Sequence, residues 1–269
     1  MINKEIVGLI KLLHAQGGLV PDLKPDPGVF LVKGDTVSVQ SLSLSVNEQG
    51  DIESSPLILH VGIDMTGYWL DIAYKHLVAT ESAHKKLMLA KEERDDEKIS
   101  RYLKKESIAG MQSIMAAGIA LDAYYASIKE HVDIPQSTID TWRENSTARY
   151  KQISEVLRMG FRLKNPSSKS LRDILKQNFK FRDKAVHPSP GTAAPQLHVE
   201  LNKVTDWRYA TFRFYNAKAI YGLSLSIVFK TSLKTDPKVA DSLKGFCEKL
   251  ILRIKPLERK WKNRFGELL

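Results

Sequence analysis

Arg182 and His187 lie five residues apart near the end of a basic stretch, in the sequence Phe181-Arg-Asp-Lys-Ala-Val-His-Pro188. A guanidinium is always charged and donates up to five N–H bonds, so Arg182 could hold a phosphate. Five residues are about 500° of helical rotation, which leaves the two side chains about 140° apart on a straight helix. Because Pro188 disfavours the helical conformation for His187, that residue should turn away from the helix line. A compact phosphate site is then assembled more easily between two copies of the segment than within one. The alternative is a histidine that interacts with the helix dipole beside a solvated arginine.

The basic charge is concentrated in the second half of the chain. The 269 residues include 41 Lys and Arg against 31 Asp and Glu, a net charge of +10. Residues 1–142 hold 14 basic and 20 acidic residues, whereas residues 143–187 hold 12 basic and only 4 acidic ones. Such an asymmetry is typical of a phosphate-binding face. The charge alone is equally compatible with a soluble basic protein.

Several functional classes are disfavoured by what the sequence lacks. The single Cys247 excludes a disulfide framework and a thiolate metal cage within one chain. His187 and His198 do not have the spacing of metal ligands on a helix, so we expect no metal and no cofactor. Gly-rich phosphate loops and a nucleophile elbow are absent, which argues against an NTPase and an α/β-hydrolase. No membrane span and no signal layout are recognisable, and we expect a cytoplasmic protein that does not bind in a membrane.

The first 62 residues are expected to form a small element that contains β-structure. Apolar spacing predicts a short helix over residues 3–14. Alternating apolar residues over 37–46 predict a strand, with a bulge near Gln40-Ser41. Residues 47–51 are typical of a hairpin turn, and a second strand is expected over 57–61.

From residue 66 onward the apolar period is that of helices. One expected helix opens at Trp69, and the next carries an apolar stripe from Ile108 to Ile128. Another covers 139–161 as one element. Further helices begin at Ser170, with Asp173 in a capping box, at Asn216 and at Asp236-Pro237. The charged run 91–97 should be a solvated helix end or turn, and the small residues of 116–123 predict a central helix that neighbours approach closely. A short hairpin is expected from 196–201 and 209–214, and Pro256 should kink or break the last helix.

Three segments together resemble the HEPN superfamily (higher eukaryotes and prokaryotes nucleotide-binding domains). The Arg182–His187 segment is similar to its Arg-x4-6-His motif, with a polar residue, Asp183, directly after the arginine. The small-residue helix 113–128, which contains Asp122, looks like the early core helix of the family, and 215–228 is similar to the helix after the motif. The resemblance covers about residues 100–230.

This resemblance implies a mainly α fold with a HEPN-like helical bundle, which we expect over residues 63–232. The β-containing element 1–62 precedes it and a basic C-terminal helix in 233–269 follows it, and both are expected from the sequence pattern alone. It implies a homodimer that brings two motifs to one cleft and a metal-independent endoribonuclease, as in toxins and phage defence. An antitoxin or other protein partner would fit that class. Arg182 would bind the scissile phosphate, His187 would act in proton transfer or position the phosphate, and Asp183 would orient either of them. The 2′-hydroxyl would attack the neighbouring phosphorus, which restricts the reaction to RNA.

Basic and aromatic residues around the motif could contact RNA. The basic side chains expected to extend the phosphate track are Lys180, Lys184, Arg172 and Lys176, with exposed charges as the alternative. Trp142, Trp207, Tyr209, Phe212 and Phe214 could stack on bases or pack in the core. Asp122 is either a polar residue at the core edge, which its apolar helix favours, or an acidic group of the cleft. The basic residues 253–264 could bind nucleic acid or an anionic membrane surface, or be solvated. The rival function is a helical module that binds nucleotide, RNA or a protein without cleavage.

Overall fold

The chain divides into two units, Met1–Gly62 and Ile63–Leu269. The structure, a computed structural model, describes residues 36–39, 44–54, 59–62, 64–186, 193–233, 236 and 238–268. It is mainly helical, as the sequence predicts, and the described residues contain eight helices. The helix expected over residues 3–14 lies outside the described residues.

The first unit contains two antiparallel strand pairs. β1 (Thr36–Val39) pairs with β4 (Leu59–Gly62), and β2 (Leu44–Val46) pairs with β3 (Ile52–Ser54). The predicted turn joins β2 to β3: Asn47 Oδ1 accepts hydrogen bonds from the backbone N–H of Gln49 and of Asp51, at 3.0 and 2.8 Å. The partner of β2 is therefore β3, which the sequence did not predict. The expected bulge at 40–41 lies outside the described residues.

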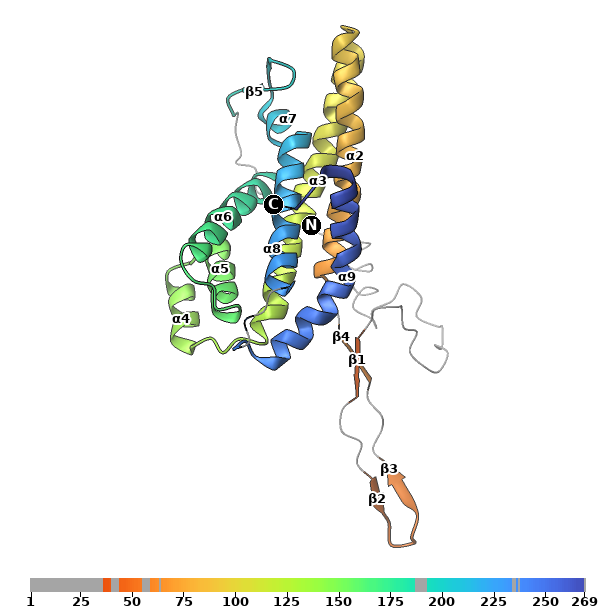
Figure 1. The fold of residues 1–269 in the computed structure, drawn as a ribbon, viewed down its shortest axis with the longest axis vertical. Coiled ribbons are helices and arrows are strands. Elements are labelled where there is room, and N and C mark those ends of the chain that lie inside the picture. The colour runs from red at the N-terminus through yellow and green to blue at the C-terminus, as the bar shows by residue number, and fades with distance from the viewer. Residues whose placement is uncertain are drawn as a thin grey trace, which may run out of the picture. The chain divides into compact units, whose positions relative to one another are not determined.

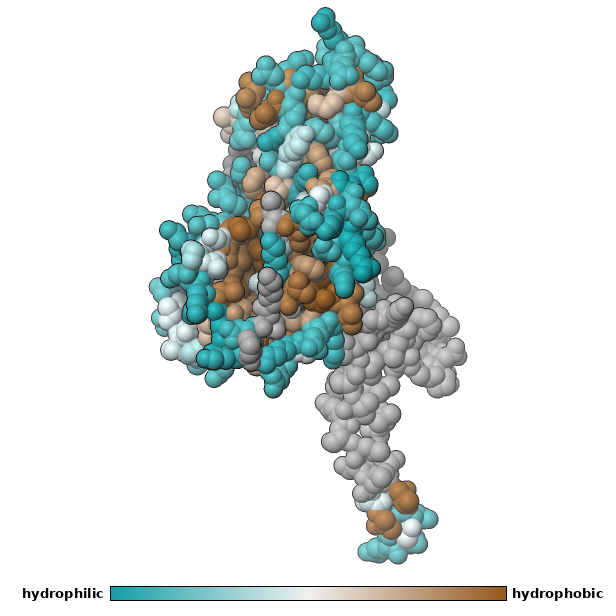
Figure 2. Space-filling model, viewed as in Figure 1, coloured by the Kyte–Doolittle hydropathy of each residue, from teal (hydrophilic) through white to brown (hydrophobic). Residues whose placement is uncertain are grey.

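The second unit is built around a long helical hairpin. α2 (Thr66–Glu92) and α3 (Asp96–Lys129) run side by side, and the charged run between them is the predicted turn. The Asp95 side chain accepts from Lys98 N at 2.9 Å and caps α3. Figure 1 shows α8 (Phe214–Leu233) beside this hairpin. On one side lie α4 (Gln136–Glu144), α5 (Arg149–Gly160) and α6 (Ser167–Val186), and on the other lies α9 (Asp241–Phe265). None of the described helices is both long and apolar enough to cross a membrane. Figure 2 shows hydrophilic and hydrophobic residues side by side on the drawn face of the second unit.

α3 is the central helix, as its small residues predict. It contacts α2, α5 (Arg149–Gly160), α6 (Ser167–Val186) and α8. Buried Ala116, Ala117 and Ala120 face these neighbours, and Ser113 Oγ donates to the Ala73 carbonyl at 2.9 Å. Because α3 also contacts α7 (Trp207–Thr211), and so touches five helices, its side chains can be brought together with residues far away in the sequence.

The single helix expected over 139–161 is wrong. The structure has α4 (Gln136–Glu144) and then α5, separated by a turn in which Ser146 adopts a positive φ of 45°. The predicted start at Ser170 is also wrong: α6 begins at Ser167, and the backbone N–H of Ser170 donates to the Pro166 carbonyl at 3.1 Å. Helical hydrogen bonding therefore extends one turn further back than the capping pattern indicated.

Two predictions fail between α6 and α8. β5 (Gln196–His198) pairs with β6 (Lys203–Thr205), whereas residues 207–211 form α7 (Trp207–Thr211), capped by the Asp206 side chain, so the second strand was misplaced. α8 begins at Phe214, so Asn216 lies inside the helix and is not its N-cap. The Asn216 amide instead donates to the carbonyls of Ala210 and Thr211.

The last helix begins at Asp241 rather than at Asp236-Pro237, and it continues through Pro256. The flanking Ile254 and Leu257 are buried in the main core, and we attribute the unbroken helix to this packing, which offsets the lost hydrogen bond.

Candidate functional site

Arg182 crosses the central helix at a glycine. The aliphatic part of its side chain packs on Gly118 of α3, where an added Cβ would lie 3.0 Å from Arg182 Cδ. Because Gly118 has no side chain, the arginine on α6 can pass close to the α3 backbone. Its guanidinium then reaches Asp122, which lies one helical turn further along α3.

The guanidinium of Arg182 is held by two carboxylates and an aromatic ring. Its Nη1 donates to Asp122 Oδ2 at 2.6 Å, while Nη2 and Nε donate to Asp183 Oδ1 at 2.8 and 3.0 Å. The guanidinium carbon lies 4.4 Å from the centre of the Phe179 ring. The Arg182 side chain is 21% exposed. These contacts orient the group and engage three of its five N–H groups, so two remain for a ligand from solvent.

Asp122 belongs to this site and is not only a polar residue at the core edge. Its other oxygen, Oδ1, accepts from Arg149 Nε at 2.8 Å, so one carboxylate joins the arginines of α5 and α6. The Arg149 guanidinium lies 4.1 Å from the Tyr125 ring centre and also donates to Gln152 Oε1. The interpretation of Asp122 favoured by its apolar helix was therefore incomplete.

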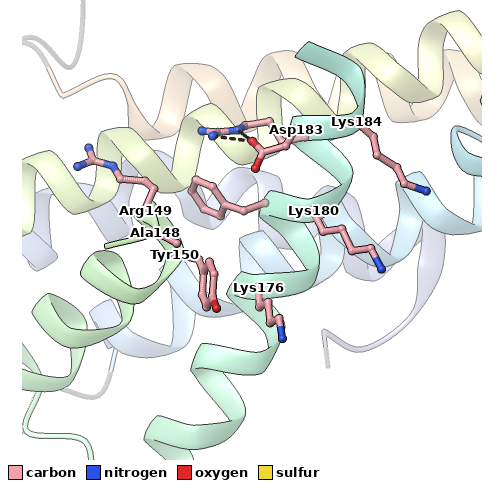
Figure 3. Close-up of a pocket in the computed structure, with 9 residues that line it drawn as sticks. Ala148, Arg149, Tyr150, Lys176, Lys180, Asp183 and Lys184 are labelled. Atoms are coloured by element: carbon pink, nitrogen blue, oxygen red, sulfur yellow. Dashed lines mark hydrogen bonds and ion pairs between the residues drawn. The ribbon is translucent and has the colours of Figure 1, made fainter. Parts of the chain in front are cut away.

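An open cleft of about 440 Å³ lies in front of this ion-pair network. We call it the α5–α6 cleft, and Figure 3 shows the residues that line it. Its lining consists of Ala148, Arg149, Tyr150, Lys176, Phe179, Lys180, Arg182, Asp183 and Lys184. Five of these side chains are cationic and one is acidic, so the cleft favours an anion.

A row of cations runs along α6 beside the cleft. Arg172, Lys176, Lys180 and Lys184 follow one another at four-residue spacing, which places successive side chains about 6 Å apart along the helix axis. Figure 3 shows that the three lysines extend from the same side of α6. No described acidic group forms an ion pair with any of the four, so their charge is not compensated locally.

The predicted site residues are brought together in part. Arg182, Asp183, Lys176, Lys180 and Lys184 all line the cleft, and Arg172 continues the row without lining it. His187 lies outside the described residues.

The structure adds Arg149 and Tyr150, which come from the start of α5. The only sequence signal for Arg149 was its position inside the basic stretch 143–187. Its contact with Asp122 joins residues that are 27 apart, so no local pattern indicates it.

The basic C-terminal helix is a weaker candidate for nucleic acid. Several of its cations are engaged within the chain: Arg264 pairs with Glu81 at 2.5 Å, Lys260 with Asp71 at 3.6 Å, and Arg253 donates to the Asp64 carbonyl. Burial opposes ionisation of Glu81, yet its pKa is lowered by hydrogen bonds from Lys85 and Arg264. α9 therefore uses much of its charge to pack on α2.

A second polar cluster is buried at the other end of the hairpin. His84 Nδ1 lies 2.9 Å from Glu106 Oε1, which also accepts from Phe214 N at 2.8 Å. His198 is fully buried and its Nδ1 is 3.4 Å from Glu200 Oε2, while Glu200 pairs with Arg213. Burial lowers the pKa of His198. Among the described residues no group of three or more His, Cys, Asp or Glu side chains could hold a metal ion.

Comparison of the chain with protein-family models, with curated proteins and with solved structures finds no match.

Proposed function

We propose that the protein is an endoribonuclease that holds the phosphate backbone of RNA in the α5–α6 cleft, with Arg182 at the scissile phosphate. The observation that carries this proposal is the oriented guanidinium of Arg182 beside a row of uncompensated cations. Fixed charges aimed at one position stabilise the charge that develops in a transition state. A row of cations beside them can follow a polyanionic strand.

The reaction is an attack of the 2′-hydroxyl oxygen on the adjacent phosphorus. The bond to the 5′-oxygen breaks, and the products are a 2′,3′-cyclic phosphate and a 5′-hydroxyl end. One proton leaves the 2′-hydroxyl and one is delivered to the 5′-oxygen. The two unengaged N–H groups of Arg182 would bind the non-bridging oxygens, and the resemblance to HEPN proteins assigns His187 to proton transfer.

The same resemblance supports a homodimer in which two copies of the Arg182–His187 segment meet. Arg182 lies four residues before the last helical residue of α6, so the motif is at an end of the helix rather than in its middle. Light scattering on the purified chain measures its mass in solution. A monomer under conditions of activity would contradict a site shared by two copies.

One observation favours a second function, a module that binds RNA without cutting it. Asp122 and Asp183 already neutralise Arg182, so a phosphate must compete with two carboxylates for this guanidinium. In this alternative the cation row supplies the affinity and Arg182 mainly holds α6 against α3.

Incubation with single-stranded RNA in EDTA separates the two functions. The wild type is compared with Arg182→Ala, His187→Ala and the control Arg101→Ala, which removes an exposed arginine that pairs with Glu97 and lines no part of the cleft. We expect cleavage by the wild type and the control only, with cyclic phosphate ends identified by mass spectrometry. Binding without cleavage supports the second function. Equal cleavage by all four proteins would refute the role of the motif.

A further inference from the structure

A second, smaller pocket adjoins the α5–α6 cleft. It has a volume of about 240 Å³ and is lined by Tyr125, Lys129, Ile139, Trp142, Arg143, Arg149 and Gln152. We call it the Trp142 pocket. Arg149 lines both this pocket and the α5–α6 cleft, so the two are neighbours that share one residue.

Trp142 presents an aromatic surface that the fold does not use fully. The ring is only partly buried, and no described aromatic ring or cation stacks on it. By contrast, Trp207 packs on Phe212, and Trp261 packs on Tyr221 and Phe265. Phe212 and Phe214 are buried in the core, so Trp142 is the expected base-stacking residue that lines a pocket next to the cleft.

The size of the pocket and the groups at its rim suit a planar polar ring. Its volume is below the range of about 300–1,000 Å³ that is typical of sites for drug-sized ligands. Lys129 is exposed, and the Arg143 side chain is 75% exposed and reaches Asp140 only at 3.7 Å. Both rim groups are hydrogen-bond donors without acceptor capacity, so they favour a ring that carries carbonyl oxygens.

We propose that the Trp142 pocket binds one nucleobase of single-stranded RNA, stacked on Trp142, while an adjacent phosphate lies in the α5–α6 cleft. This inference rests on the proposed function, because it assumes that RNA is the ligand of the cleft. Bases of single-stranded RNA are commonly recognised by stacking on aromatic side chains and by hydrogen bonds at their edges.

The ion-pair network connects the two parts of such a nucleotide. Arg149 borders the base pocket, Arg182 borders the phosphate site, and Asp122 holds both guanidiniums at 2.8 and 2.6 Å. The ribose would span the wall that Arg149 forms between the pockets. Recognition of one base would then set which phosphate lies at Arg182, and this would give the cleft a preference among linkages.

The test compares two short RNA strands in binding to the full chain. One is oligo(U), whose base carries two carbonyl oxygens, and the other has the same ribose-phosphate backbone with its central bases removed. Stacking of one base contributes roughly 5- to 100-fold to affinity. We therefore expect at least about fivefold weaker binding of the abasic strand, measured by fluorescence anisotropy.

Variants place this base contact at Trp142. Trp142→Ala should weaken oligo(U) binding to the level of the abasic strand and leave abasic binding unchanged, while Tyr68→Ala, which removes an exposed tyrosine of α2, should change neither. Trp142→Phe keeps an aromatic ring if the alanine variant fails to fold. It should retain most of the affinity but lose the quenching of tryptophan fluorescence that oligo(U) causes in the wild type.

The results distinguish a failure of the base pocket from a failure of RNA binding in the α5–α6 cleft. Equal affinity of the wild type for both strands, with binding still dependent on Lys180 and Lys184, overturns the base pocket and leaves the phosphate cleft standing. Absence of binding to either strand overturns both proposals.

Discussion

Replacement of Asp122 by asparagine tests how the site is held together. The amide keeps the size of the side chain but removes the charge that two arginines share. Asp122 Oδ2 accepts from Arg182 at 2.6 Å and Oδ1 accepts from Arg149 at 2.8 Å. An asparagine has one carbonyl oxygen, so it can accept from one guanidinium while its NH₂ group faces the other.

The expected loss of stability follows from the partial burial of this network. The Asp122 and Arg182 side chains are 26% and 21% exposed. A hydrogen bond to a charged group contributes about 1.5–3 kcal/mol, whereas an exposed ion pair contributes about 0–1 kcal/mol. For this intermediate case we expect a loss of about 1–2 kcal/mol, which lowers Tm by about 2–8 °C in a chain of this size.

The same substitution should change RNA binding and RNA cleavage in opposite directions. Removing a negative charge about 6 Å from a bound phosphate gains about 0.7 kcal/mol in a water-like dielectric, or about threefold in affinity. The cleavage rate should fall at least about tenfold, since displacement of a catalytic group by about 1 Å can cost about 100-fold. Tighter binding together with slower cleavage identifies Asp122 as a positioning residue.

Thermal unfolding, anisotropy with labelled RNA and single-turnover cleavage measure the three effects. Asp71→Asn is the matched control, because Asp71 is 33% exposed and also pairs with two cations, Lys75 and Lys260, away from the cleft. It should leave binding and cleavage unchanged. If Asp122→Asn melts within 1 °C of the wild type and cleaves RNA at the same rate, Asp122 does not hold Arg182 and the reasoning fails.

Three other predictions concern packing, the cation row and pH. Gly110→Ala should lower the free energy of unfolding by at least about 2 kcal/mol, measured by chemical unfolding, because the new Cβ meets the backbone carbonyl at the end of α7. The control Gly245→Ala in α9, which has open space around it, should not lower the free energy of unfolding. Lys180→Ala with Lys184→Ala should reduce the slope of log affinity against log salt by about 0.7 per cation; an unchanged slope would exclude them from the RNA track. Burial lowers the pKa of His198 in the folded chain below its ordinary value of 6.5. As pH falls below 6.5, the unfolded chain therefore takes up the proton first. The stability that is present above pH 6.5 is lost as pH falls toward the folded-state pKa. Urea unfolding from pH 8 to 5 should show this fall, and His198→Gln should flatten it; an equal fall in both proteins would assign it to other groups.

Local patterns in the sequence identified most helices and part of the site. The apolar period located α2, α3 and α8, and the small residues around Ala117 identified the central helix. The four-residue spacing from Arg172 to Lys184 already implied one face of one helix. These features depend on residues close together in the chain, which is why the sequence alone could predict them.

The features that the sequence did not predict depend on contacts between distant residues or on turns that no clear sequence pattern marks. The apolar residues on the two sides of 145–148 stay in phase, so one helix was predicted across the polar residues 145–147. In the structure the chain turns there between α4 and α5, with Ser146 at a positive φ. Asp122 and Arg182 are 60 residues apart, and no local pattern indicates that Gly118 allows them to meet. Arg149 was missed for the same reason.

The carboxylate that two arginines share has a consequence for how ligands act together. Asp122 accepts from Arg149 and from Arg182. A phosphate that drew Arg182 toward itself would leave Asp122 to Arg149 alone and would alter the wall of the Trp142 pocket. By thermodynamic reciprocity, a ligand in the α5–α6 cleft that changes the affinity of the Trp142 pocket by some factor requires that a ligand in the pocket changes the affinity of the cleft by the same factor. Ligand binding in the α5–α6 cleft and in the Trp142 pocket is therefore expected to be coupled, with either positive or negative cooperativity.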